Sequence, residues 1–129
     1  MTVPLRYSDM VDVVVDRIPA FRDSDWGREV LETDRDLPYV VFGAFASFLK
    51  HLLTEVPPTD PTVRSSFELL NEMAASPEQQ VVDLAATGVF EVLTDSAHSI
   101  RAARQLLYGP AIHLFEQMIQ LWGVDVTDP

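Results

Sequence analysis

Proline and glycine residues divide this chain into amphipathic segments, and that division constrains the fold more than any other feature of the sequence. Within each segment, apolar residues recur at the i, i+3, i+4, i+7 spacing of one helical face. The rival pattern, the alternation of a strand, extends over no more than a few residues, and the run 11–15 that comes nearest to it has helical flanks. The sequence therefore predicts an all-α fold.

The positions of proline and glycine divide the chain into about six to seven short helices. We place them at residues 8–18, 24–33, 38–56, 61–75, 77–94, 96–107 and 111–122. The segment 38–56 is apolar on nearly all sides, which predicts the central and most buried helix. Short connections favour antiparallel neighbours, so we expect one helical domain over residues 1–129, either a bundle or a short HEAT-like array. We expect the least order at residues 1–7 and 124–129.

Small polar residues stand before most of these segments and predict their N-caps. These residues are Ser8, Ser24 or Asp25, Asp36, Asp60, Ser76, and Asp95 or Ser96. Gln79 follows Ser76 by three positions, which is the spacing of a capping box. Gly88 lies inside the segment 77–94, where glycine costs up to about 1 kcal/mol relative to alanine. We therefore expect a close helix crossing at Gly88.

The composition fits a globular protein in a reducing compartment. A chain of 129 residues with 47% apolar and 22% charged residues can bury a single core. The absence of cysteine excludes disulfides and thiolate chemistry and fits a reducing compartment. The longest apolar run, 39–49, has about half the roughly 20 residues that span a bilayer, and the N-terminus lacks a signal-peptide pattern. We expect a cytoplasmic protein with no membrane partner.

The sequence contains no catalytic constellation. His51, His98 and His113 lack the spacing of a metal site, and the scattered glycines form no phosphate-binding loop. Asp95, Ser96 and Ser99 lie near His98, but they stand at the start of a helix, where capping explains Asp95 and Ser96. We therefore expect no enzyme activity, no metal and no cofactor.

Net charge carries the clearest functional signal. Twenty acidic residues against nine basic ones give a formal charge of −11, which disfavours nucleic acids and anionic membranes and favours a basic protein partner. No basic residue occurs between Arg64 and Arg101, so we expect one contiguous acidic surface on the helices 61–75 and 77–94. Its candidate partner-binding residues are Glu68, Glu72, Asp83, Glu91 and Asp95. Alternatively, the acidity only keeps the protein soluble or reflects adaptation to salt.

A family resemblance makes this signal more specific. The stretches 67–73, 76–93 and 106–110, with Asp83, Gly88 and the pair Phe90-Glu91, resemble a family of small uncharacterised helical bacterial proteins. Members of that family often look like immunity proteins encoded beside polymorphic or contact-dependent toxins. The resemblance covers about residues 40–122 and leaves the first two helices outside. It implies a non-catalytic immunity protein that neutralises a basic toxin domain by direct binding.

A second hypothesis needs no toxin. A helical adaptor or structural domain could hold a partner helix in a concave apolar groove. Such a groove would expose some of the large aromatic side chains as a patch of a few hundred Å² or more. The aromatic residues available for it are Phe42, Phe45, Phe48, Phe90, Phe115 and Trp122.

Overall fold

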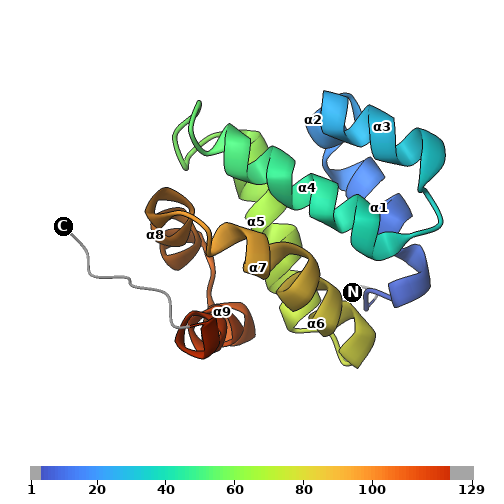
Figure 1. The fold of residues 1–129 in the computed structure, drawn as a ribbon. Coiled ribbons are helices and arrows are strands. Elements are labelled where there is room, and N and C mark those ends of the chain that lie inside the picture. Colours follow the sequence, from blue (N-terminus) through green and yellow to red (C-terminus); the bar gives the residue numbers. More distant parts are fainter. Residues whose placement is uncertain (1–3, 123–129) are drawn as a thin grey trace.

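The computed structural model describes residues 4–122, apart from the side chain of Trp122, and every regular element in this part is a helix (Figure 1). The predicted all-α fold is confirmed. The least order was expected at residues 1–7 and 124–129; of these, 1–3 and 124–129 lie outside the described residues. The elements are the 3₁₀ helix η1 (Tyr7–Asp9), α1 (Met10–Arg17), α2 (Pro19–Arg22), α3 (Asp25–Thr33), α4 (Pro38–Leu52), α5 (Pro61–Ala74), α6 (Gln79–Ala85), the π-helical η2 (Ala86–Phe90), α7 (Glu91–Leu93), α8 (Ala97–Leu106) and α9 (Gly109–Trp122).

Helix α4 is the centre of the fold, as the apolar pattern predicts. It contacts α1, α3, α5, α6, η2 and α7, and in Figure 1 it crosses in front of α5. Phe45 of α4 meets Phe21 and Phe42 edge-on at ring-centroid distances of 5.5 and 5.9 Å, and all three side chains are fully buried. In a repeat array each unit contacts only its neighbours. Contacts of α4 with elements from both halves of the chain therefore make the fold a bundle.

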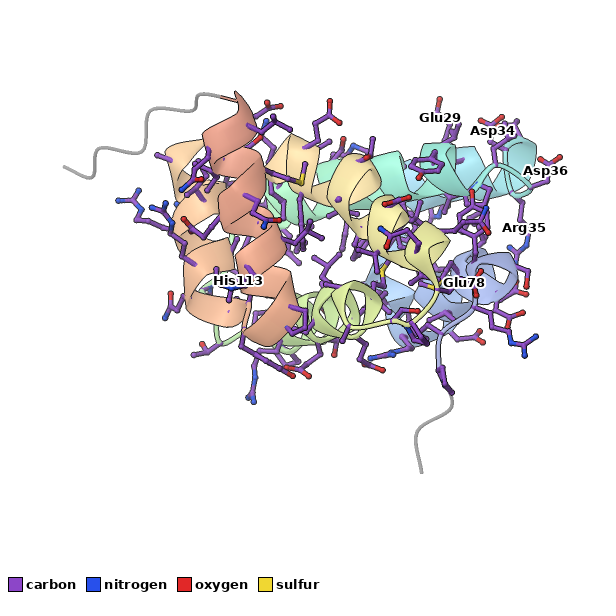
Figure 2. All side chains as sticks on the ribbon, turned by 90° about the horizontal axis from the view of Figure 1, so that it is seen from below. Glu29, Asp34, Arg35, Asp36, Glu78 and His113 are labelled. Atoms are coloured by element: carbon purple, nitrogen blue, oxygen red, sulfur yellow. The ribbon has the colours of Figure 1, made fainter. Side chains whose placement is uncertain are left out.

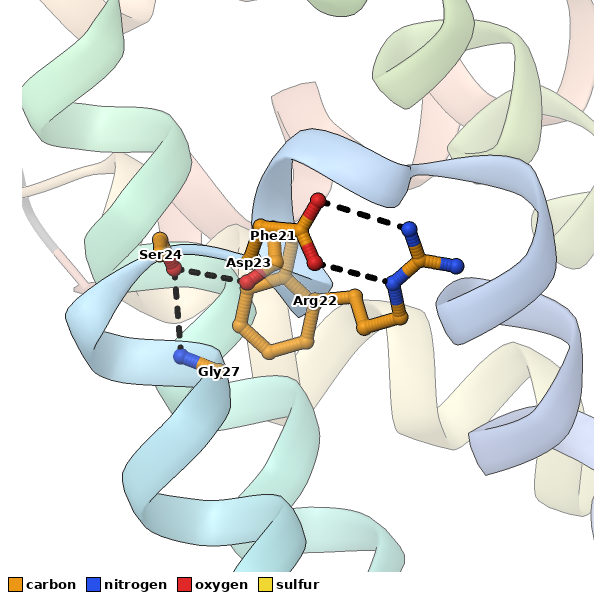
Figure 3. Close-up of polar contacts among 5 residues, drawn as sticks. All are labelled: Phe21, Arg22, Asp23, Ser24 and Gly27. Carbon is orange, nitrogen blue, oxygen red and sulfur yellow. Dashed lines mark hydrogen bonds and ion pairs between the residues drawn. The ribbon is translucent and has the colours of Figure 1, made fainter.

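Local caps begin several helices where the sequence predicts them. The hydroxyl of Ser24 accepts a hydrogen bond from the Gly27 amide at 3.1 Å and donates one to the Phe21 carbonyl at 2.7 Å (Figure 3). Asp60 and Ser96 likewise accept backbone amides at the starts of α5 and α8. These caps satisfy N–H groups that the helix itself leaves without partners.

Two predicted caps are wrong by a residue or more. Ser8 lies inside η1, and α1 begins only at Met10. The N-cap of α4 is Leu37 and not Asp36, because Pro38 occupies the first helical position directly after it. Proline suits this position, since its missing N–H would have no partner inside the helix.

The predicted capping box at Ser76 is also wrong. The Ser76 hydroxyl donates to the Leu5 carbonyl at 3.3 Å and accepts the Glu78 amide at 3.1 Å, and α6 begins only at Gln79. The Gln79 side chain donates instead to Asp83, one turn further on, at 2.8 Å. Ser76 thus anchors the N-terminal segment to the bundle.

The segment 77–94 forms no continuous α-helix, because the π-helical turn η2 separates α6 from α7. A π turn contains one residue more than an α turn and shifts the buried face by one position. The buried positions are Leu84 and Ala85 in α6, three consecutive residues, Gly88, Val89 and Phe90, in η2, and Leu93 in α7. Gly88 lies in this turn, and a Cβ atom added to it would stand 3.4 Å from the Phe42 Cβ. The predicted close crossing at Gly88 is confirmed.

Candidate functional site

The candidate acids of α5 face α1 and the connection between α8 and α9. Glu72 forms an ion pair with Arg17 of α1, and both side chains are about one-third exposed. Glu68 accepts a hydrogen bond from the hydroxyl of Tyr108 at 3.1 Å. Both carboxylates therefore have a partner within the chain.

The other candidate acids lie along α6 and α7, beside α4. Asp95 pairs with Lys50 near the end of α4 at 3.5 Å. Asp83 accepts the hydrogen bond from Gln79 and lies close enough to Tyr39 at the start of α4 to act on its hydroxyl. Glu91 is half-buried and forms no ion pair with any described residue. The structure thus gives the candidate acids two different sets of neighbours, one on α5 and one on α6 and α7.

Two tyrosines near these acids have raised pKa values. The pKa of Tyr108 is raised, first because its hydroxyl donates to Glu68 and second because the Glu68 charge opposes ionisation. The pKa of Tyr39 is raised mainly by burial of its hydroxyl, with smaller contributions from Tyr7 and Asp83. Both phenols therefore stay protonated, and able to donate hydrogen bonds, well above neutral pH.

Most basic side chains are engaged by acids of the same chain. The ion pairs that arginine and lysine side chains form are Arg17–Glu72, Arg22–Asp23, Arg35–Asp12, Lys50–Asp95 and Arg104–Glu116. Exposed pairs of this kind contribute about 0–1 kcal/mol each. Their consequence for function is electrostatic: the pairs match five of the nine lysine and arginine charges, and acidic residues outnumber basic ones by 20 to 9.

Part of that surplus gathers at the end of α3 and in its connection to α4. Figure 2 shows Glu29, Asp34 and Asp36 at this corner, with Arg35 beside them. Arg35 pairs with Asp12 of α1 at 3.1 Å. Glu29 and Asp36 are exposed, and neither forms an ion pair with a described residue. From the sequence this segment is interpreted as a mixed charged surface, with Asp36 as an N-cap. Its acids are not among the candidate partner-binding residues because Arg35 lies among them.

The start of α4 also presents apolar side chains to solvent. Leu37, Tyr39 and Val40 are 48%, 43% and 43% exposed, and the buried face of the helix begins at Val41. The sequence analysis placed Tyr39 and Val40 in the most buried helix. A signal was available in Gly43 and Ser47, which lie on the same helix face as Val40 and are small or polar.

Large aromatic side chains do not form the groove that the adaptor hypothesis requires. Phe42, Phe45, Phe90 and Phe115 are fully buried, and Phe48 is 7% exposed. The side chain of Trp122 lies outside the described part. The burial of these five phenylalanines thus argues against that hypothesis.

His98 and Ser96, which lie close together in the sequence, form structural contacts. A ring nitrogen of His98 contacts the Leu53 carbonyl oxygen, and the Ser96 hydroxyl caps α8 through the amide and hydroxyl of Ser99. His98 also lines a hollow of about 540 Å³ between α8 and the connection from α4 to α5. Within residues 4–122, no group of three or more histidine or acidic side chains is placed to hold a metal ion.

Among the described helices, none is both long and apolar enough to cross a bilayer. A family model described as "Domain of unknown function (DUF7674)" matches residues 11–123, so the chain belongs to this family. The match includes the first helices, which the resemblance in the sequence had left outside, and its description names no activity. No curated protein and no solved structure gives a significant match.

Proposed function

We propose that this member of the DUF7674 family is a non-catalytic acidic protein that binds a basic protein partner, and more specifically a cytoplasmic immunity protein that neutralises a cognate toxin domain. The observation that carries the proposal is the charge arrangement. The chain has a formal charge of −11, and most of its basic side chains form ion pairs with its own acids. The remaining carboxylates are available to a partner.

The physical effect of such a surface is on association. A field of one sign steers an oppositely charged partner and raises its association rate by about 10 to 10³-fold at low salt. A toxin domain that acts on nucleic acid needs a basic substrate groove. An acidic protein seated on that groove would exclude the substrate without any catalytic group, metal or cofactor.

The first experiment is affinity capture of the tagged protein from a lysate of its own host, with washes at low and then high salt. We expect a single basic protein that is retained at low salt and released at high salt. The captured domain is then expressed alone and together with this chain. Growth arrest by the domain, relieved by co-expression, is the result expected of an immunity protein. Recovery of nothing, or of many proteins released together, would contradict the proposal.

Once the partner is identified, its affinity for charge-reversal variants tests the candidate contact residues. The variant Glu68→Lys/Glu91→Lys should weaken binding, while Glu72 is left intact because its loss would break the ion pair with Arg17. A matched control, Asp16→Lys/Glu32→Lys, makes the same change of net charge at exposed positions of α1 and α3. Equal affinities of the two variants would mean that the candidate acids are not the contact surface.

A further inference from the structure

The start of α4 is a helix face without a partner in the described structure. In Figure 1, α4 runs between α3 on one side and α6 and α7 on the other, with its outer surface toward the viewer. Leu37, Tyr39 and Val40, which we call the α4 patch, lie at the start of α4 and are exposed. One turn further, a Cβ atom added to Gly43 would find no atom within 4 Å, so the helix surface is open there as well.

Carboxylates surround the α4 patch. Asp36 directly precedes Leu37 in the chain, and Glu29 and Asp34 lie at the same corner (Figure 2). On the side of α6, the charge of Asp83 makes a small contribution to the raised pKa of Tyr39, after burial and Tyr7. An apolar centre that includes a tyrosine, inside a polar and charged rim, is the usual anatomy of a protein-binding surface.

We propose that the α4 patch is the centre of a docking surface for an amphipathic helix of a basic protein, whose apolar side chains cover Leu37 and Val40 and whose Lys or Arg side chains pair with the surrounding carboxylates. This inference rests on the proposed function and gives it a contact surface. The α4 patch and the candidate acids Glu68 and Glu91 are alternative contact surfaces: the charge-reversal pair tests the acids, and the peptide titration below tests the α4 patch.

Charge complementarity favours a basic helix over a second copy of this chain as the occupant of the α4 patch. A second copy of the chain would bring the acids around one α4 patch against the acids of the other, and both copies carry a formal charge of −11. Every regular element within residues 4–122 is helical, so the described part offers no strand edge to an extended peptide. A helix seated by side chains at i, i+3 and i+4 is the recognition mode that remains.

The test uses a defined probe, a synthetic helical peptide with Leu and Ala on one face and Lys on the other. The peptide is titrated into the full-length ¹⁵N-labelled protein, and amide resonances are followed by NMR. We expect the largest shifts at Leu37, Val40, Gly43 and Asp83. Two control peptides separate the contributions: one with Ser in place of Leu and Ala keeps only the charge, and one with Glu in place of Lys keeps only the apolar face. Both should bind at least about tenfold more weakly.

A pair of variants isolates the α4 patch. Val40→Lys places a positive charge in its centre and should weaken binding of the Lys peptide by about tenfold or more. Leu121→Lys makes the same chemical change at a position that is 81% exposed at the far end of α9, and it should alter binding by less than about twofold. Both sites are exposed, so both variants should fold, and circular dichroism checks this. Because the NMR mapping uses the unaltered protein, it decides the question even if one variant does not fold.

Several results would overturn the inference: no binding of the Lys peptide, shifts centred on α5 or α8, or equal binding by the two variants. Sedimentation of the unaltered protein as a dimer that Val40→Lys dissociates would assign the surface to a second copy instead. The proposed function and the docking surface can be refuted independently of each other. A captured toxin domain that binds Val40→Lys and the unaltered protein equally would refute this surface and leave the function standing. Peptide binding at the α4 patch, together with failure to capture any toxin domain, would refute the proposed function and leave the docking surface standing.

Discussion

Substitution of Gly27 by alanine should destabilise the protein, although alanine is the better helix former. A Cβ atom at this position would stand 2.0 Å from the carbonyl oxygen of Phe21, and real Cβ atoms essentially never come within 3.0 Å of another heavy atom. The turn between α2 and α3 must therefore open by at least the difference, 1.0 Å. That same oxygen accepts hydrogen bonds from the amide and the hydroxyl of Ser24 (Figure 3).

The expected cost follows from these contacts. Loss of the two hydrogen bonds costs about 0.5–1.5 kcal/mol each, and displacement of the fully buried Phe21 against Phe45 adds about 1–3 kcal/mol. The helix propensity of alanine offsets about 1 kcal/mol of this. We expect Gly27→Ala to lower the free energy of unfolding by about 1–5 kcal/mol.

Gly43→Ala is the matched control. It is the same substitution inside a helix, at a position with no atom within 4 Å of the added methyl group. It should raise the free energy of unfolding by about 0.5–1 kcal/mol. Urea denaturation followed by far-UV circular dichroism measures both values. If Gly27→Ala were as stable as Gly43→Ala, the packing of α2 against the start of α3 would not be as described.

Three further predictions concern the second half of the chain. Asn71 is buried and bridges the connection between α8 and α9, donating to the Leu106 carbonyl at 3.2 Å and accepting the Tyr108 amide at 3.0 Å, so Asn71→Ala should cost about 2–3 kcal/mol in urea denaturation. The bond from Tyr108 to Glu68 raises the folded-state pKa of Tyr108, so its contribution to stability is complete below the unfolded-state pKa of about 10 and is lost as the pH rises through the folded-state value. In an ultraviolet titration, Glu68→Gln should let Tyr108 ionise at lower pH; an unchanged curve would contradict the contact. At Gly88 a methyl group just fits beside the neighbouring side chains, so Gly88→Ala should melt near the unaltered protein while Gly88→Leu should lose about 1–3 kcal/mol.

Features that depend on neighbouring residues in the sequence could be predicted. The caps at Ser24, Asp60 and Ser96 are local, because each hydroxyl or carboxylate reaches an amide two or three residues away. The central position of α4 follows from its composition alone. Gly88 could be assigned to a close crossing because glycine inside a helix has an energetic cost that packing must offset.

Features that depend on distant parts of the chain could not be predicted. Ser76 forms no capping box because it binds Leu5, which lies 71 residues away in the sequence. The ion pair of Glu72 with Arg17 spans 55 residues. The density of acids between Arg64 and Arg101 is visible in the sequence, but the partners that divide them between two sides of the bundle are not. The exposed start of α4 was missed for the same reason, since an apolar residue gives no sign of which face the tertiary contacts will leave open.

The most direct test of the binding function is the affinity between this protein and its captured partner, measured by calorimetry over a range of salt concentrations. The account predicts a stoichiometric complex whose dissociation constant rises steeply with salt, because the attraction between an acidic protein and a basic one is screened. It also predicts that the complex is inactive in the partner's own assay. A complex whose affinity is indifferent to salt, or in which the partner stays fully active, would contradict it.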